Sequence, residues 1–414
     1  MSTQMAAAAC DERETKCANG ARQCWSATFP DDLVAVVYRM VASPRGRARF
    51  AAVCRSWRAA ARAAPPVPAL PWLLFSPRYD GRVRTLHCPE DGALVRLRVP
   101  GEDVGRWIIG CHDGGWVALP EPAGPVRIVN LFSGAEVALS KKKVTILCPS
   151  RHHAHARLVF ISKFVFSAPP TSPQCILAGV THKCGMALCK AGCSNSGWTV
   201  QGCPDKGKLD DMAFCNGELY GLRRNTTLVK FEIGMNEDGA PATLMETIDH
   251  TIAVYRDSTS YIFDLHGKPG MALKTQWLRN TLPFFKVFKL ADIHMGRQKA
   301  RYKREWLEVT CLGDHSLFLG VIFSKAVHVS ANGRGDVKRN QIYYSDNCWF
   351  GTEDFMPGDI VSVAISNDSS SVTCHKEDDS KSGITGDGLK RIISVRYIMK
   401  GRSHGGMWIL PPDI

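Results

Sequence analysis

The chain has 414 residues, of which 45% are hydrophobic and 22% charged. It is long enough for two or three folded domains, and its composition excludes a disordered protein. The formal net charge is +13, but basic residues are spread along the whole sequence without a base-reading motif, so we expect no nucleic-acid partner. No run approaches the ~20 apolar residues of a membrane-spanning helix, so we expect no membrane partner.

Residues 1–24 are Ala-rich and polar without periodicity, which is typical of a flexible tail. Charged residues occupy positions 11–14, where a secretory signal peptide would need an apolar stretch. The 16 cysteines are therefore expected to be reduced and mostly buried, as small apolar side chains. These features predict a protein of the cytoplasm and/or nucleus.

Residues 25–64 are predicted to form two or three short helices. The first helix has apolar residues at the spacing of one helical face: Leu33, Val36, Val37, Met40 and Val41. Ser43 and Pro44 then end this helix and begin the next, which is predicted to continue to Ala64 before Pro65 stops it. The apolar face of that second helix contains Phe50, Val53, Cys54 and Trp57. A unit this small with spare apolar surface favours a partner.

A proline-rich hinge at residues 65–71 precedes residues 72–414, in which many short runs are alternating, β-branched or aromatic, as in β-strands. Turn pairs such as Asp91-Gly92 and Asn216-Gly217 separate the runs and tolerate the positive φ of tight hairpins. Strands over ~340 residues exceed one sandwich, so the predicted fold is a small all-α unit followed by an all-β domain, best fitted by a β-propeller. No fixed-period repeat is visible, and the number of blades stays open. Residues 366–388 are polar and Gly-rich, as in an exposed loop.

Two motifs in the helical region resemble those of the F-box family. Phe29-Pro30-Asp31-Asp32-Leu33 stands where the family has Leu-Pro, two variable residues and leucine, and Val53-Cys54-Arg55-Ser56-Trp57 matches its Val-Cys-x-x-Trp signature. Phe29 and Val34 replace common leucines and remain apolar. The resemblance implies an F-box at residues 25–64 that docks onto a Skp-type adaptor, and through it onto a cullin. The adaptor-binding residues that it implies are Phe29, Pro30, Leu33, Val34, Val53, Cys54 and Trp57.

The same apolar residues also have a plainer interpretation. A helical bundle needs an internal core whether or not it has a partner. In that case these side chains would only hold the helices together: Leu33, Val37, Phe50, Val53 and Trp57. Pro30 and Val34 are then the better candidates for docking.

The rest of the chain resembles the propeller that follows the F-box in a large plant family, long labelled a domain of unknown function (the DUF295/KIB type). Matching segments occur in the family's order: Pro71–Phe75, Gly110–Leu119, Asn130–Gly134, Trp198–Tyr220, Leu312–Phe318 and Ile342–Asp346. The resemblance implies the substrate-recognition subunit of an SCF-type (Skp–cullin–F-box) ubiquitin ligase, whose propeller binds an unknown substrate protein. The main alternative is a non-ligase scaffold or interaction protein built on the same propeller.

No short catalytic motif is present: we find no nucleophile elbow, P-loop, HExxH or dinucleotide fingerprint, and expect neither enzymatic activity nor a cofactor. Four cysteines only partly match the spacing of a zinc site: Cys184, Cys189, Cys193 and Cys203. Of His152, His153 and His155, strand alternation would place the last two on one face as a weak metal-binding pair, but no third ligand lies near them. Buried strand cysteines and a polar loop are the simpler interpretations, so no metal is predicted. An enzymatic propeller and a nucleic-acid-binding propeller are kept as alternatives.

Overall fold

In the computed structural model the chain divides into two compact units: a helical unit, Met1–Val67 together with Ile414, and a β unit, Pro68–Asp413. The structure describes residues 30–41, 43–64, 68–75, 83–98, 108–120, 126–139, 147–148, 157–158, 161–181, 185–192, 197–201, 208–223, 226–237, 239–248, 258–275, 283–294, 302–331, 333–345, 360–366, 392–399 and 407–412. The tail predicted at residues 1–24 and, apart from Ser366, the loop predicted at 366–388 lie outside these ranges.

The described part of the helical unit contains three short helices: α1 Asp31–Met40, α2 Pro44–Ala51 and α3 Arg55–Ala63. Ser43 caps α2 as predicted, since its Oγ accepts a hydrogen bond from the backbone N–H of Gly46 at 3.0 Å. The prediction of one continuous helix from Pro44 to Ala64 is wrong. Cys54 takes an extended backbone conformation there and begins α3 as a separate helix, so that α3 packs against both α1 and α2.

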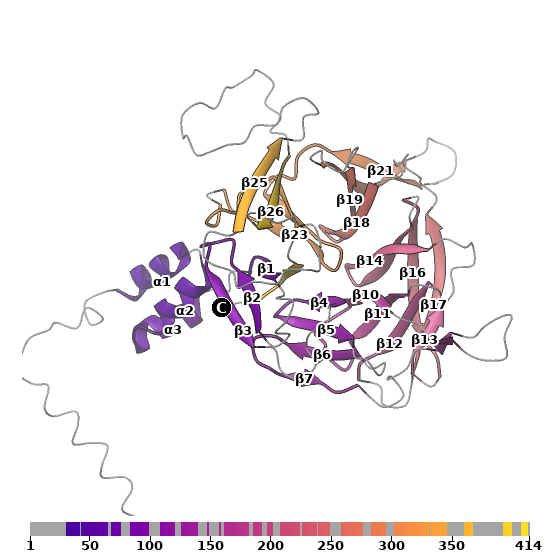
Figure 1. Ribbon diagram of the computed structural model, residues 1–414, viewed down its shortest axis with the longest axis horizontal. Coiled ribbons are helices and arrows are strands. Elements are labelled where there is room, and N and C mark those ends of the chain that lie inside the picture. The colour runs from indigo at the N-terminus through magenta and orange to yellow at the C-terminus, as the bar shows by residue number, and fades with distance from the viewer. Residues whose placement is uncertain are drawn as a thin grey trace, which may run out of the picture. The chain divides into compact units, whose positions relative to one another are not determined.

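The strands of the β unit follow one another in antiparallel meanders, the blades of a propeller (Figure 1). The first blade has β1 Trp72–Phe75, β2 Val83–His87 and β3 Leu94–Arg98, and the second β4 Gly110–His112, β5 Trp116–Pro120, β6 Val126–Asn130 and β7 Glu136–Val137. The third has β10 Ile161–Phe166, β11 Ile176–Thr181, β12 Met186–Lys190 and β13 Thr199–Gln201; the fourth has β14 Leu209–Cys215, β15 Glu218–Arg223, β16 Leu228–Met235 and β17 Pro241–Ile248. The fifth has β18 Ser258–Leu265, β19 Lys268–Thr275, β20 Phe284–His294 and β21 Tyr302–Val309.

The β unit also contains a sixth blade and a separate pair of short strands. The sixth blade contains β22 His315–Leu319, β23 Ser324–His328, β24 Gln341–Tyr344, β25 Ile360–Ser366 and β26 Ile393–Met399, and two short strands, β8 Leu147–Cys148 and β9 Arg157–Leu158, pair with each other. The sixth blade departs from a simple meander, because β24 pairs in parallel with both β22 and β26. The predicted combination of a helical unit with an all-β propeller is therefore confirmed. Apart from β8 and β9, the described strands group into six blades, of which the second and third are joined in one eight-stranded sheet.

Pairing between distant segments closes the propeller. The last strand, β27 Met407–Ile409, pairs antiparallel with β1, with Trp408 opposite Leu73. The second and third blades meet where Gly110 pairs in parallel with Phe164, and a Cβ at Gly110 would lie only 2.5 Å from the Phe164 Cβ. Glycine is therefore needed at this approach of two backbones. Closure of this kind protects strand edges that would otherwise pair with other chains.

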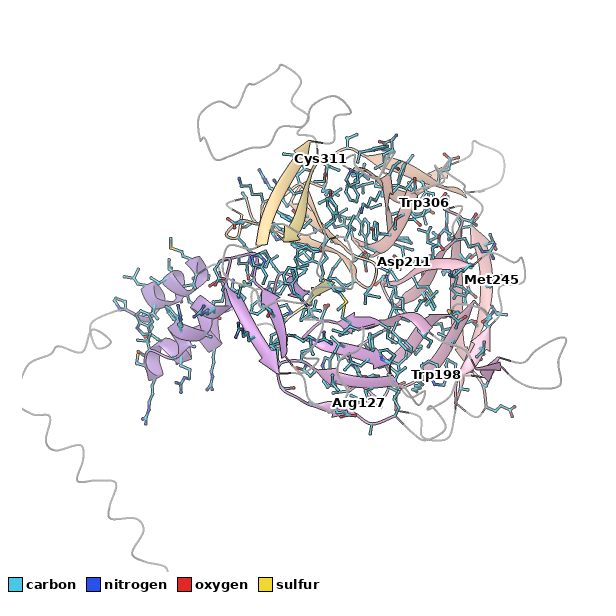
Figure 2. All side chains as sticks on the ribbon, in the orientation of Figure 1. Arg127, Trp198, Asp211, Met245, Trp306 and Cys311 are labelled. Atoms are coloured by element: carbon cyan, nitrogen blue, oxygen red, sulfur yellow. The ribbon has the colours of Figure 1, made fainter. Side chains whose placement is uncertain are left out.

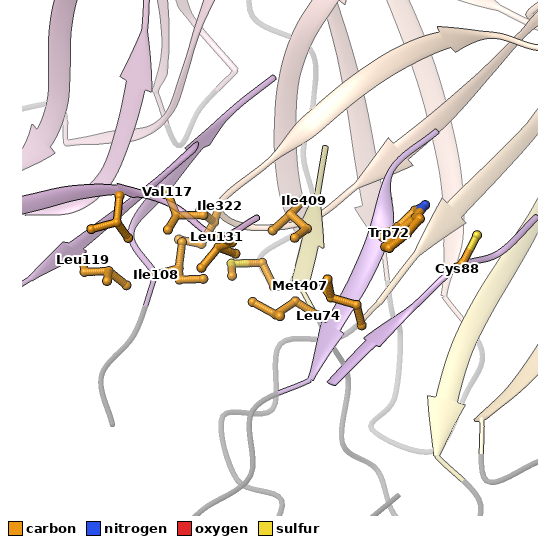
Figure 3. Packing of buried hydrophobic residues seen from close by; sticks show 12 residues of the cluster. Trp72, Leu74, Cys88, Ile108, Val117, Leu119, Leu131, Ile322, Met407 and Ile409 are labelled. Carbon is orange, nitrogen blue, oxygen red and sulfur yellow. The ribbon is translucent and has the colours of Figure 1, made fainter. Parts of the chain in front are cut away.

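The apolar core lies between neighbouring blades. One cluster combines Trp72 and Leu74 of the first blade with Val117 and Leu119 of the second and with Ile409 from the C-terminal strand (Figure 3). Burial of such side chains supplies the main favourable term in folding. The expectation of buried cysteines is confirmed for four of the described ones: Cys88, Cys175, Cys189 and Cys215.

Candidate functional site on the helical unit

Three aromatic side chains in mutual contact hold the three helices together. Tyr38 of α1 lies 5.3 Å from Phe50 of α2, measured between ring centroids, and Phe50 lies 4.3 Å from Trp57 of α3. Val34, one helical turn before Tyr38, is also buried in this core, with a side chain that is 2% exposed. The face of α1 that packs inward is therefore the one with Val34 and Tyr38, at i and i+4.

A second apolar face of α1 points away from this core. Its residues follow the i, i+3, i+4, i+7 spacing and are exposed: Leu33 (50%), Val36 (44%), Val37 (39%) and Met40 (78%). We call these four residues the α1 stripe. Val53, in the turn between α2 and α3, is 59% exposed as well. Because apolar side chains at helical spacing on one face normally pack against something, the α1 stripe is a candidate contact surface.

A groove of about 410 Å³ lies on a third face of α1, next to α3. Small side chains form most of it: Ala35, Ala59, Ala60, Ala63 and Ala64. Asp31 and Asp32 from the first turn of α1 and Arg39 from its last turn add opposite charges to its lining. Small residues on one face of a helix let another backbone approach closely. The groove is therefore a concave surface next to the α1 stripe.

Cys54 occupies the start of α3, and its thiol is polarised. Its Sγ lies 3.2 Å from the Ser56 Oγ. The hydrogen bond with the Ser56 side chain, followed by one with the Trp57 backbone, lowers the pKa of the Cys54 thiol. This side chain is half-buried, so the second motif contributes a hydrogen-bonded thiol as well as apolar groups.

Two arginines of the helical unit, Arg47 on α2 and Arg58 on α3, have structural roles. Arg47 is buried, and its Nε donates to the backbone oxygen of Val41, just beyond the end of α1, at 3.0 Å. Arg58 Nε donates to the Ala51 oxygen at the end of α2 at 3.1 Å. Both satisfy carbonyl groups that a helix end leaves without an intrahelical partner.

The seven predicted adaptor-binding residues fall in different environments. Pro30, Leu33 and Val53 are exposed, whereas Cys54 and Trp57 are half-buried. Phe29 lies outside the described residues. Val34, favoured above as a docking residue, instead packs in the core, because it faces Phe50 and Ala60 rather than the surface. Adaptor binding by these residues stays a prediction.

The interpretation that five apolar residues only form the core is wrong for three of them. Leu33, Val37 and Val53 are exposed, and only Phe50 and, in part, Trp57 fill the interior. The adaptor-binding set inferred from the motifs omitted Val36, Val37 and Met40. The helical spacing of these three residues with Leu33 is the sequence signal that identifies them as part of the same face.

The other predicted sites are only partly described. Cys189 is buried in β12, whereas Cys184, Cys193, Cys203 and the three histidines from His152 to His155 lie outside the described residues. Among the residues that the structure describes, no group of three or more metal-ligating side chains is arranged to hold an ion. Within the same ranges, no helix has the length and apolar character to cross a membrane.

Comparison with known proteins identifies the β unit. A family model described as the KIB1-4 beta-propeller matches residues 85–372. The Arabidopsis thaliana protein named "Putative F-box protein At4g22180" is 31% identical over 117 residues, which is 28% of this chain and 28% of that protein.

Two solved structures are also similar. The N-terminal domain of Nup159 is 9% identical, with a TM-score of 0.28, over 59% of this chain and 64% of its own length. The Cps50 (Swd1) beta-propeller domain of Myceliophteria thermophila is 10% identical, with a TM-score of 0.27, over 62% of this chain and 80% of its own length.

Proposed function

Because this chain belongs to the KIB1-4 beta-propeller family, we propose that it is the substrate-recognition subunit of an SCF-type ubiquitin ligase in the cytoplasm and/or nucleus. The helical unit binds a Skp-type adaptor, and through it a cullin, while the propeller binds the substrate protein. The exposed α1 stripe is the observation that carries this proposal. Similarity to a protein named as an F-box protein supports it.

The α1 stripe has the chemistry of a small anchoring interface. Burying a Leu or Met side chain against a partner contributes about 1.5–3 kcal/mol. Met40 and Leu33 are the most exposed members of the stripe, so they have the most surface to gain from burial. Val53 adds a further apolar side chain from the second motif. Few such anchors, surrounded by polar groups, are enough to dominate a protein interface.

In this function the chain performs no bond chemistry itself. Holding a substrate and a ubiquitin-loaded enzyme on one assembly converts their encounter into an effectively intramolecular one. A propeller suits the substrate-binding part, because its packed blades fix the positions of the loops that connect them. The helical unit then needs only to bind the adaptor firmly.

Binding of the full chain to a purified Skp-type adaptor tests the proposal. The wild type is expected to bind, and Leu33→Asp/Met40→Asp is expected to weaken binding by roughly tenfold or more, because two anchors become charged. Ala48→Asp, at an exposed position of α2, adds a charge outside the stripe and is the matched control. A wild type that binds no adaptor, or a double variant that binds equally well, refutes the proposal. Adaptor binding without recruitment of a cullin points instead to a non-ligase scaffold.

A further inference from the structure

A cavity of about 310 Å³ lies among the inner strands of five blades of the β unit. It is bounded by the carboxyl-terminal parts of β4, β10, β14 and β18 and by the beginning of β23. Phe166, Phe214 and Phe323 contribute apolar walls. Its polar lining includes His112, Asp113, Lys163, Asn216, Asp264 and Lys325, together with the hydroxyl groups of Ser167 and Ser324. A volume at the lower end of the usual range for ligand pockets suits one long side chain.

The charges around the cavity leave one carboxylate without a cation. Lys325 Nζ lies 2.5 Å from Asp113 Oδ2, and Lys163 is paired with Asp211 behind the cavity wall. With Asp264 added, the two lysines face three aspartates. The group of five side chains has a formal charge of −1. Among the described residues no lysine or arginine pairs with Asp264.

The Asp264 carboxylate is held in place by backbone groups. Its Oδ1 accepts from the Gly267 N–H at 2.6 Å and its Oδ2 from the Asn216 N–H at 3.2 Å. Each carboxylate oxygen has a further lone pair, so both can still accept a hydrogen bond from a ligand. A fixed carboxylate in a partly enclosed cavity attracts a cation more strongly than one in open water does.

Lys163 supplies a complementary donor. Its ammonium group carries three N–H donors, of which the described residues engage one, through Asp211 Oδ1. The side chain is almost fully buried and lines the cavity. Since Asp211 balances its charge, a neutral acceptor such as a peptide carbonyl suits Lys163 better than a further anion does.

We infer that this cavity is a recognition pocket for a basic side chain, arginine or lysine, of an extended peptide segment. Asp264 pairs with the guanidinium or ammonium group, and the apolar stem packs against Phe166 and Phe214. Lys163 donates to a carbonyl oxygen of the peptide backbone. Calling the peptide a substrate segment rests on the receptor function proposed above; the binding chemistry does not.

Selection from a phage-displayed library of random dodecapeptides against the full chain tests this pocket. Enriched peptides are expected to share one Arg or Lys. Replacing that Arg by citrulline, or that Lys by norleucine, should lower affinity roughly 10- to 100-fold, the range expected for one charge-assisted hydrogen bond. Asp264→Asn should lower affinity equally and should cause no further loss with the neutral peptide. Asp292→Asn is the matched control, because Asp292 pairs with Lys268 and Arg304 on the fifth blade, outside the pocket.

Several results overturn the inference. These are no enrichment above the bare support, enriched peptides without a shared basic residue, or undiminished binding by a folded Asp264→Asn variant. Should Asp264→Asn fail to fold, since Asp264 also holds the turn after β18, the citrulline and norleucine peptides test the same contact on the wild type. No adaptor is used in this experiment. A chain that selects basic peptides but ignores every Skp-type adaptor therefore keeps the pocket and loses the ligase function, and the reverse result separates them equally well.

Discussion

Lys163 on β10 forms an ion pair with Asp211 on β14, and both side chains are buried, with exposed fractions of 6% and 4%. Asp211 Oδ2 also accepts the backbone N–H of Ile262, on β18, at 3.0 Å. One carboxylate thus joins the inner strands of three consecutive blades. In Figure 2 Asp211 lies nearer the centre of the β unit than Arg127 and Met245, which mark its rim.

Asp211→Ala is expected to destabilise the β unit strongly. It leaves the buried Lys163 ammonium without its counter-charge and the Ile262 N–H without its acceptor, at a cost of about 3–5 kcal/mol. Asp292→Ala breaks exposed pairs with Lys268 and Arg304 and is expected to cost at most about 1 kcal/mol. Denaturant unfolding of the two variants beside the wild type measures the difference. Equal losses would show that the buried pair has no special role.

The general fold could be predicted because its signals are local. Asn216 and Gly217 take the expected positive φ, 49° and 80°, in the two-residue turn between β14 and β15. The three-residue strand β27 has no such signal, because its partner β1 lies more than 300 residues earlier and so short a run carries no pattern. β12 also lacks the alternating pattern of a half-buried strand, since its first four residues are all buried.

The helical site was harder to predict, because α1 has apolar residues on two faces. Leu33 and Met40 show helical periodicity, and so do Val34 and Tyr38. Spacing alone cannot say which face turns inward. The ring contacts of Tyr38 with Phe50, and of Phe50 with Trp57, decide it. These contacts depend on the interruption of the helix at Cys54, which the sequence pattern did not reveal.

The Arg334-Gly335-Asp336 turn gives a second stability prediction. Gly335 has a φ of +62°, and an added Cβ would lie 1.6 Å from the backbone oxygen of Glu90. Gly335→Ala is therefore expected to cost about 3 kcal/mol or more, from backbone strain and overpacking together. Gly313 has a similar φ of +61° with open space around it, so Gly313→Ala should cost only about 1–2 kcal/mol. Both variants introduce backbone strain, but only Gly335→Ala adds a steric clash, so the difference between their unfolding midpoints measures the clash. Similar midpoints for the two variants would contradict the close packing of Gly335 against Glu90.

His87 on β2 should make stability depend on pH. Burial lowers its pKa to about 4, while the Asp336 and Asp91 carboxylates oppose this shift. In the unfolded chain the imidazole titrates near 6.5. Between about pH 4 and pH 6.5 the unfolded chain binds a proton at this imidazole and the folded chain does not, so unfolding takes up a proton. The free energy of unfolding is therefore fully retained above about pH 6.5 and falls as the pH is lowered toward about 4. From pH 7 to pH 5 the wild type should lose about 2 kcal/mol more than His87→Leu. Parallel losses in the two proteins would rule out this contribution.

Cys54 is expected to react readily with iodoacetamide at neutral pH. Its lowered pKa raises the thiolate fraction, and the Ser56 hydroxyl is the first cause of that shift. Ser56→Ala should therefore slow the alkylation of Cys54. The rate is measured by mass spectrometry of the peptide that contains Cys54. Cys175 and Cys189 are buried and should stay unmodified in the native protein. Equal rates in the wild type and Ser56→Ala would show that Ser56 does not control the thiol.

An aspartate substitution should destabilise the helical unit on the buried face of α1 and leave its stability unchanged on the exposed face. Val34→Asp places a carboxylate beside Phe50 and Ala60 in a core too small to rearrange, and burying an unpaired charge costs several kcal/mol. The helical unit of this variant should lose protection of its amides in hydrogen exchange, while the β unit keeps its own. Met40→Asp lies on the exposed α1 stripe and should leave exchange in all three helices unchanged within about 0.5 kcal/mol. If Met40→Asp instead unfolds the helices, the stripe is part of the core, and its assignment as a docking surface has to be abandoned.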